Sequence, residues 1–422
     1  MSATTTSDRK LKAQCCIAGG GPAGMMLGFL LARAGVEVVV LEKHADFLRD
    51  FRGDTIHPST LEVMYELGLL EDFLKRPHQE LDHIDAQFGD HRVTIGDFTH
   101  LPTQCKFIAL MPQWDFLNFL VEHAKRYPGF RVEMQAEVTK LTETDGRVTG
   151  VEAKTPKGVL RLEADLTVGA DGRSSTVREH AGMKVIDLGA AMDVFWMRIS
   201  KGADDPGQTL GRVDPGSILV MLDRGDYWQC AFVIPKGTAD DVREKGLAAF
   251  RERIVELAPH LRDRVDELKS WEDIKLLTVK VDRLKRWDRP GLLCIGDAAH
   301  AMSPIGGVGI NLAIQDAIAA ANILATPLRR GTVTQEDLKT VQKRREFPTR
   351  VIQRVQIFIQ NNGILNVLGS KGGPMELPLP FRLLGEFPWL RRIPARLVGM
   401  GPRPEHVETP DLAAEKRADS GV

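Results

Sequence analysis

The sequence predicts an α/β protein in which a βαβ unit opens the chain, a β-meander and a separate antiparallel sheet follow, and a helical segment ends it. Three observations predict this fold class. Residues 13–41 have the pattern of a buried strand, a glycine-rich turn, a buried helix and a β-branched strand. Asp145-Gly146 separates two strand-like runs, which indicates a hairpin. Residues 183–283 show the alternation typical of antiparallel strands.

The elements of the first half follow from spacing and from turn residues. Gly35 is placed to cap the first helix, and Tyr127-Pro128-Gly129 to end the third. The sequence predicts helices over 58–69 and 113–125, and strands over 131–134, 137–144, 147–154 and 162–168. The strands at 131–134, 137–144 and 147–154 form a small β-meander, and 162–168 is a further strand.

The second half begins with strands and ends with helices. It contains predicted strands at 194–199, 217–222, 227–234 and 292–295, and predicted helices at about 247–261 and 311–324. The stretch 377–404 is rich in proline and arginine, and Pro388 and Pro394 argue against one long amphipathic helix there. We expect this stretch to be a lid or packing segment.

Composition excludes several classes of protein. Lys and Arg number 56 against 57 Asp and Glu, so the net charge of -1 gives no field that favours nucleic acid. The N-terminus lacks the apolar core of a secretion signal, and no run reaches the about 20 apolar residues of a membrane span. We therefore expect a cytoplasmic protein, a monomer or homodimer, without a transmembrane segment.

The cysteines show no pairing pattern. Cys15, Cys16, Cys105, Cys230 and Cys294 are scattered without a CxxC pair, and we interpret them as reduced thiols. No metal site is expected.

Gly19, Gly21 and Gly24 form a G-x-G-x-x-G turn between a strand and a helix. The first glycine permits the tight turn, the second lets the backbone approach a pyrophosphate, and the third allows close helix–strand packing. Glu42 follows at the end of the next strand, where a carboxylate can accept ribose hydroxyls. The residues expected to contact the dinucleotide here are Gly19, Gly21, Pro22, Ala23, Gly24, Glu42 and Lys43.

Two later motifs select the kind of dinucleotide. The runs GADGRSSTVR at 169–178 and CIGDAAH at 294–300 resemble two further fingerprints of the p-hydroxybenzoate hydroxylase family of flavoprotein monooxygenases. The resemblance implies non-covalent FAD, with NADH or NADPH as a transient reductant. It also implies O₂ and a small aromatic, phenolic or quinone-like substrate, hydroxylated through a flavin C4a-hydroperoxide.

The same resemblance assigns roles at the flavin. It implies that Asp297 binds a ribityl hydroxyl and that the helix after residue 309 points its N-terminus at the pyrimidine edge. Backbone N–H groups of Gly309, Ile310 and Asn311 would then stabilise negative charge on the reduced ring. Further positions matching family contacts are Arg52 and Gln113 near FAD, Asp171 ordering the pyrophosphate loop, and Arg173 or Arg178 near the nicotinamide nucleotide.

Domains and a substrate site follow from the order of motifs. We expect a discontinuous FAD-binding domain over 1–75, 101–182 and 284–345, and a substrate-binding β-sheet domain over 76–100 and 183–283. Residues 346–422 are expected to form a C-terminal helical lid with a disordered tail. His57 and Tyr227 are weak candidates for catalysis, and Met221, Trp228 and Phe232 are candidates for lining a pocket or a core.

Three alternatives remain open from the sequence. A flavin-dependent halogenase is disfavoured, because the stretch 230–235 lacks both tryptophans of the W-x-W-x-I-P motif. A flavin-dependent reductase, which needs no oxygen, is less firmly excluded. A non-catalytic flavin-binding interaction module would use the basic, aromatic segment around Trp389 and Arg391 to contact a partner.

Overall fold

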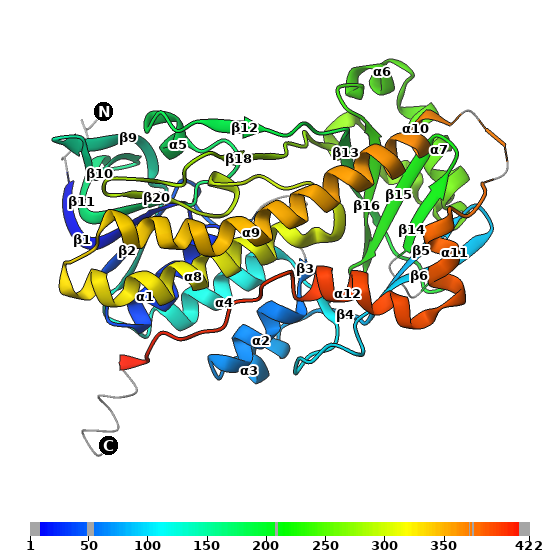
Figure 1. Cartoon of the computed structure of the whole chain (residues 1–422). Coiled ribbons are helices and arrows are strands. Elements are labelled where there is room, and N and C mark those ends of the chain that lie inside the picture. The colour runs from blue at the N-terminus through cyan, green and yellow to red at the C-terminus, as the bar shows by residue number, and fades with distance from the viewer. Residues whose placement is uncertain (1–8, 49–54, 207–209, 371, 374, 413–422) are drawn as a thin grey trace.

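Two large sheets lie at opposite ends of the molecule, and helix α9 (Gln335–Ile359) runs from one to the other (Figure 1). The computed structural model describes residues 9–48, 55–206, 210–370, 372–373 and 375–412. Both sheets and the helical C-terminal part confirm the predicted fold class. The expected disordered tail lies outside the described residues from 413 onward.

The first sheet carries the βαβ unit. Its order is β19 (Asp288–Arg289), β20 (Leu292–Cys294), β11 (Gly158–Gly169), β1 (Arg9–Ala18), β2 (Val38–Glu42) and β8 (Phe130–Met134), with β10 (Arg147–Thr155) and β9 (Glu137–Thr144) extending from β11. Strand β1 pairs in parallel with β11 on one side and with β2 on the other. A strand in that position is covered on both faces, which explains its apolar run.

The hairpin is confirmed, but the expected first strand of the meander, β8, pairs in parallel with β2, and the antiparallel meander consists of β9, β10 and β11. Strands β9 and β10 pair antiparallel across Asp145 and Gly146, whose φ angles are 49° and 75°. Asp and Gly tolerate positive φ better than most residues, so this pair sets the register of the hairpin.

The second sheet is antiparallel except for one pair. It runs β17 (Lys275–Leu277), β13 (Met192–Ser200), β16 (Tyr227–Pro235), β15 (Ser217–Asp223), β14 (Leu210–Asp214), β5 (His83–Phe88) and β6 (His91–Asp97), with β14 and β5 parallel. Strands β5 and β6 come from the early segment 76–100 that we expected in the substrate domain. The full division into domains stays a prediction, and α9 runs without a break across its boundary at residue 345.

The other helices cover these sheets and join them. They are α1 (Pro22–Arg33), α2 (Pro58–Glu66), α3 (Leu70–Leu74), α4 (Gln113–Ala124), α5 (Thr176–His180), α6 (Ala239–Glu244), α7 (Leu247–Leu257), α8 (Val308–Arg330), α10 (Leu365–Gly369), α11 (Leu379–Glu386) and α12 (Arg392–Gly399). The helix predicted over 58–69 is shorter, because Gly68, at a φ of 69°, ends it before α3 begins. The predicted break between α11 and α12 is confirmed at Pro388.

Short elements complete the chain. The 3₁₀ turns are η1 (Pro259–Leu261), η2 (Val265–Glu267), η3 (Trp271–Asp273), η4 (Gly296–Ala298), η5 (Ile305–Gly307) and η7 (Pro388–Arg391), and a π turn η6 covers Gln360–Ile364. Strands β3 (Thr55–Ile56), β7 (Ile108–Leu110) and β4 (Gln79–Leu81) form a small sheet, and β12 (Val185–Asp187) pairs with β18 (Asp282–Leu284).

Helix α8 is the central helix of the protein. Among the described residues, the helical stretch Ile305–Arg330 alone has the length and hydropathy of a membrane span, but 78% of its most apolar window is buried inside the protein. It packs against α1 and α9, as a core helix does. Its start carries one end of the candidate site.

Candidate active site

The glycine turn between β1 and α1 has one open position and two closed ones. A Cβ on Gly19 would lie 2.4 Å from the carbonyl oxygen of Ala170, and a Cβ on Gly24 would lie 1.9 Å from that of Gly19. A Cβ on Gly21 would meet no atom within 4 Å. The fold therefore requires glycine at 19 and 24, whereas position 21 leaves bare backbone beside open space.

The start of α1 suits an anionic ligand. Gly21 is its N-cap, and the helix has neither a side-chain cap nor an acidic residue in its first turn. Pro22 occupies the first position, where a missing N–H costs nothing, and Ala23 adds only a methyl group. Uncapped N–H groups and the helix dipole attract phosphate, so the turn fits a pyrophosphate.

Glu42 is fixed at the end of β2, next to this turn. Its carboxylate accepts hydrogen bonds from the N–H groups of Gly20, at 2.9 Å, and His44, at 3.0 Å. An ionised carboxylate has about four lone-pair sites, so it can still accept from ribose hydroxyls. Lys43 is exposed beside it.

Asp171 orders the loop that follows β11. Its carboxylate accepts from the hydroxyl of Ser175 at 2.5 Å and from the backbone N–H of Val177 at 3.0 Å. Burial raises the pKa of Asp171 in spite of these hydrogen bonds. The loop that Asp171 orders includes Ala170, which packs on Gly19. Asp171 therefore helps to fix the position of the glycine turn.

The second end of the site lies at η4 and the start of α8. Asp297 follows β20 and is partly exposed, and the guanidinium of Arg173 lies 3.5 Å from its carboxylate. Gly306 and Gly307 adopt φ angles of 76° and 64°, and α8 then starts without a side-chain cap or an acidic residue in its first turn. The backbone N–H groups of Gly309 and Ile310 therefore suit an anionic ring edge.

Asn311 has a structural partner for its side chain. Its amide oxygen accepts from the hydroxyls of Ser59, at 2.6 Å, and Thr60, at 3.2 Å, which ties α8 to α2. The side chain of Asn311 is buried. Any role of this residue at the flavin falls to its backbone N–H group.

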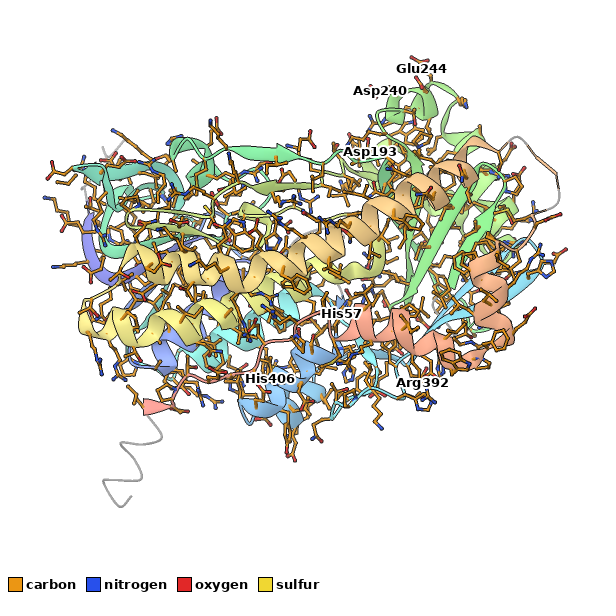
Figure 2. The ribbon with its side chains drawn as sticks, viewed as in Figure 1. His57, Asp193, Asp240, Glu244, Arg392 and His406 are labelled. Atoms are coloured by element: carbon orange, nitrogen blue, oxygen red, sulfur yellow. The ribbon has the colours of Figure 1, made fainter. Side chains whose placement is uncertain are left out.

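His57 is buried directly beneath the turn that precedes α8. Its Nδ1 donates to the carbonyl of Val398 at 2.8 Å, and its Nε2 lies 3.3 Å from the hydroxyl oxygen of Thr55 (Figure 2). Thr55 in turn donates to the carbonyl of Gly307 at 3.3 Å. Burial lowers the pKa of His57 to about 4, so the imidazole is neutral near pH 7.

This environment predicts a pH dependence of stability. The unfolded chain protonates His57 below about pH 6.5, whereas the folded protein does so only near pH 4. The free energy of unfolding should therefore fall by up to about 3 kcal/mol as the pH drops through this interval. His57→Asn, which keeps a donor towards Val398, should show a smaller loss. Urea denaturation at several pH values measures the free energy of unfolding of the original protein and of His57→Asn. Equal losses of stability in the two proteins would contradict the prediction.

The remaining candidates are less well connected to the two ends of the site. Gln113 is the first residue of α4 and is half-buried. Tyr227 starts β16, and the guanidinium carbon of Arg198 lies 3.9 Å from its ring centroid. Arg52 lies outside the described residues. Met221, Trp228 and Phe232 belong to the core that packs under α7.

A hollow of about 430 Å³ adjoins Asp297 through Arg173. Arg173, Ser174 and Lys280 are among its lining residues. Arg178 also lines it, but its guanidinium is committed to the carboxylate of Asp282, at 3.2 Å. Of the two arginines expected near the reductant, Arg173 lines this hollow with a partly exposed side chain, whose ion pair is with the partly exposed Asp297.

Sequence reasoning missed a buried polar group behind η4. His300 and Asp316 are buried and their side chains lie 2.5 Å apart, and Arg345 is fully buried beside Asp316. The signal was available, because Asp316 is the one charged residue of α8 before Arg329, in a mostly apolar part of the helix. No group of His, Cys, Asp and Glu that could hold a metal ion occurs in the part of the chain that the structure describes.

A glycine turn between the parallel strands β1 and β2, together with a second uncapped helix start at α8, suits a protein that binds a dinucleotide. The comparison with known families agrees. Residues 12–355 match the family described as FAD binding domain, and the chain belongs to this family.

Named relatives give the type of reaction. The chain is 35% identical over 346 residues to 6-methylpretetramide 4-monooxygenase of Streptomyces rimosus, covering 81% of this chain and 82% of that protein. It is 26% identical to para-nitrophenol 4-monooxygenase of Pseudomonas sp. strain WBC-3, covering 78% and 82%. The protein is an FAD-dependent oxidoreductase of the aromatic-monooxygenase type, which confirms the resemblance seen in the motifs.

A solved structure shares the fold. It is p-nitrophenol 4-monooxygenase PnpA from Pseudomonas putida DLL-E4, with a TM-score of 0.75, 20% identity, and coverage of 94% of this chain and 100% of that one. At that identity the likeness concerns the fold alone.

Proposed function

We propose that the protein is a single-component monooxygenase that uses NADH or NADPH and O₂ to hydroxylate a small aromatic, phenolic or quinone-like substrate. The observation that supports this best is a pair of uncapped helix starts, at α1 and α8, in a chain whose relatives are named aromatic monooxygenases. Its location in the cytoplasm and its state as a monomer or homodimer stay predictions.

Residues of the chain would hold and tune the cofactor. Bound FAD would supply the redox chemistry, in which two electrons from NAD(P)H reduce O₂, one oxygen atom enters the substrate and the other leaves as water. Gly21 and the start of α1 would receive the pyrophosphate, Glu42 the ribose hydroxyls and Asp297 the ribityl chain. The first N–H groups of α8 would hold negative charge at the ring, in a position that needs no reorganisation during the reaction.

The second sheet would bind the substrate. Ile305, in the turn before α8, packs in a cluster with Ile218 and Val233 of this sheet. In the same cluster, the rings of Phe88 and Phe381 contact each other at a tilt of 42°, with centroids 4.5 Å apart. Apolar and aromatic side chains on this side favour an aromatic ring and exclude water from the reaction.

The reductant would bind at the hollow beside Arg173. The cations of Arg173 and Lys280 suit the phosphates of a nicotinamide nucleotide. The chain has no second G-x-G-x-x-G motif, which supports transient binding on the surface. A protein base is needed only for a phenolic substrate, and Tyr227 stays a candidate partner for that hydroxyl.

The product should gain one oxygen atom from dioxygen. Without an aromatic substrate, purified protein with FAD should oxidise NADH or NADPH slowly. An accepted phenol or quinone should make this oxidation faster, because the substrate starts productive turnover. The measurement is turnover under labelled dioxygen with mass spectrometry of the product.

Three other outcomes would contradict this proposal. An unlabelled product that forms equally well without air indicates the reductase. Incorporation of added chloride or bromide indicates the halogenase. If no phenol or quinone stimulates the oxidation of NADH or NADPH by the FAD-loaded protein, the protein is a flavin-binding module without this activity.

A further inference from the structure

The segment after α12 lies along the helices of the FAD side of the protein. We call residues 400–412 the C-terminal strap (Figure 1). The side chain of Asn322 on α8 donates to the carbonyl of His406 at 2.8 Å, and the N–H of Val407 donates to Glu66 on α2 at 2.8 Å. Figure 2 shows His406 next to α2. The strap lies beyond residue 355, where the match to the FAD family ends.

Glu405 is the strap's deepest contact. It is 5% exposed and accepts from Nη1 of Arg345 at 3.0 Å and from Nε of Arg344 at 2.9 Å. Arg345 is fully buried, and its Nη1 also donates to the carbonyl of Arg403 at 3.1 Å. Two of the acceptors for this buried cation therefore come from the strap.

Arg345 also contacts Asp316, on the side of the protein where we place the flavin. Its Nε donates to one oxygen of Asp316 at 3.0 Å. The other oxygen of Asp316 accepts the backbone N–H of Gly296 at 3.1 Å and lies 2.5 Å from Nε2 of His300. Burial acts to raise the pKa of Asp316, but His300 and Arg345 outweigh it and hold the pKa below its ordinary value.

Gly296 is the residue before Asp297 and has a φ of 57°. A hydrogen bond from its N–H to a buried carboxylate fixes the turn η4 and so the position of the Asp297 side chain. Asp316 can hold this turn only while its own charge is matched, because an unmatched buried carboxylate is costly. Arg345 matches it, and the Nη1 group of Arg345 donates to Glu405 and Arg403 of the strap, while its Nη2 group donates to Gln315.

We propose that the C-terminal strap is part of the FAD site, with Glu405, Arg345 and Asp316 as positioning residues that set the turn carrying Asp297. The inference rests on the proposed placement of FAD beside Asp297. Coupling of this kind is reciprocal: whatever the strap adds to FAD affinity, FAD adds to the stability of the docked strap.

The first measurement needs no variant. Amide hydrogen exchange in the strap of the full-length protein should slow by about tenfold when FAD is added to apoprotein, which lies in the usual range of coupling between sites. Helix α6, at the opposite end of the molecule in Figure 2, is the reference and should not change. Exchange in the strap that is indifferent to FAD would overturn the proposal.

The second measurement compares matched variants. Glu405→Gln should raise the dissociation constant of FAD by about tenfold. Glu408→Gln removes the same charge from an exposed position on the strap and should leave it unchanged. The affinity of FAD is decisive here, since a purely structural contact would lower the stability of the apoprotein without changing how tightly the folded protein binds FAD.

Asp297→Ala separates the two hypotheses. If it weakens FAD binding while Glu405→Gln binds as tightly as Glu408→Gln, the coupling is wrong and the placement of FAD stands. If neither variant weakens FAD binding, the placement of FAD beside Asp297 is wrong, and the proposed role of the strap is wrong as well.

Discussion

Gly21→Val should strongly weaken FAD binding and leave the fold intact. Position 21 faces open space, and its extended backbone, with φ -77° and ψ -174°, accepts a β-branched residue. The added methyl groups would occupy the space where the pyrophosphate approaches the start of α1. We expect the dissociation constant of FAD to rise by about 100-fold or more, equal to about 2.7 kcal/mol.

Quenching of flavin fluorescence on titration with apoprotein measures this loss. The free energy of unfolding of the apoprotein should stay within about 1 kcal/mol of the original, the scale of a changed N-cap. Gly385→Val, another glycine with no atom near its Cβ but on α11, is the control and should bind FAD normally. If Gly21→Val bound FAD as tightly as the original protein, the pyrophosphate could not lie at the start of α1.

Gly24→Ala, in contrast to Gly21→Val, should lower the stability of the apoprotein itself. Its new Cβ would lie 1.9 Å from the carbonyl oxygen of Gly19, and that oxygen belongs to backbone that cannot rotate away. Helix α1 would have to move from β1, in the middle of the largest core. We expect a loss of about 3 kcal/mol in the free energy of unfolding.

Urea denaturation without FAD measures that loss directly, since ligand binding then makes no contribution. Gly21→Ala is the matched control, because it adds the same atom three residues earlier, where there is room. Equal stability of the two variants would show that the close approach at Gly24 is not what holds α1 against the strand.

The FAD side of the fold was predictable because its signals are local. Gly19, Gly24 and the Asp145-Gly146 turn each occupy a conformation or a contact that few other residues permit. Helix α8 was placed correctly but begins earlier than predicted, because Val308 and Gly309 continue the helix directly from the glycine turn.

The parts that could not be predicted depend on contacts between distant residues. Nothing near Glu405 in the sequence indicates that it meets Arg345, and nothing near His57 indicates that the carbonyl of Val398 accepts a hydrogen bond from it. The pairing of β5 with β14 joins residues 83–88 to a strand after 209, which no periodic pattern reveals. Such pairs follow from the folded topology alone.

The order in which the first sheet is assembled has a consequence for biosynthesis. Strand β1 is made early, yet its neighbour β11 ends at residue 169, and β20, which pairs with β11, ends at residue 294. Arg345 gains its partner Glu405 only after a further 60 residues have been synthesised. Pairings across such separations form slowly and leave apolar strands exposed in the meantime. Nascent chains should therefore depend on chaperones until these partners have been synthesised, and should load FAD only afterwards.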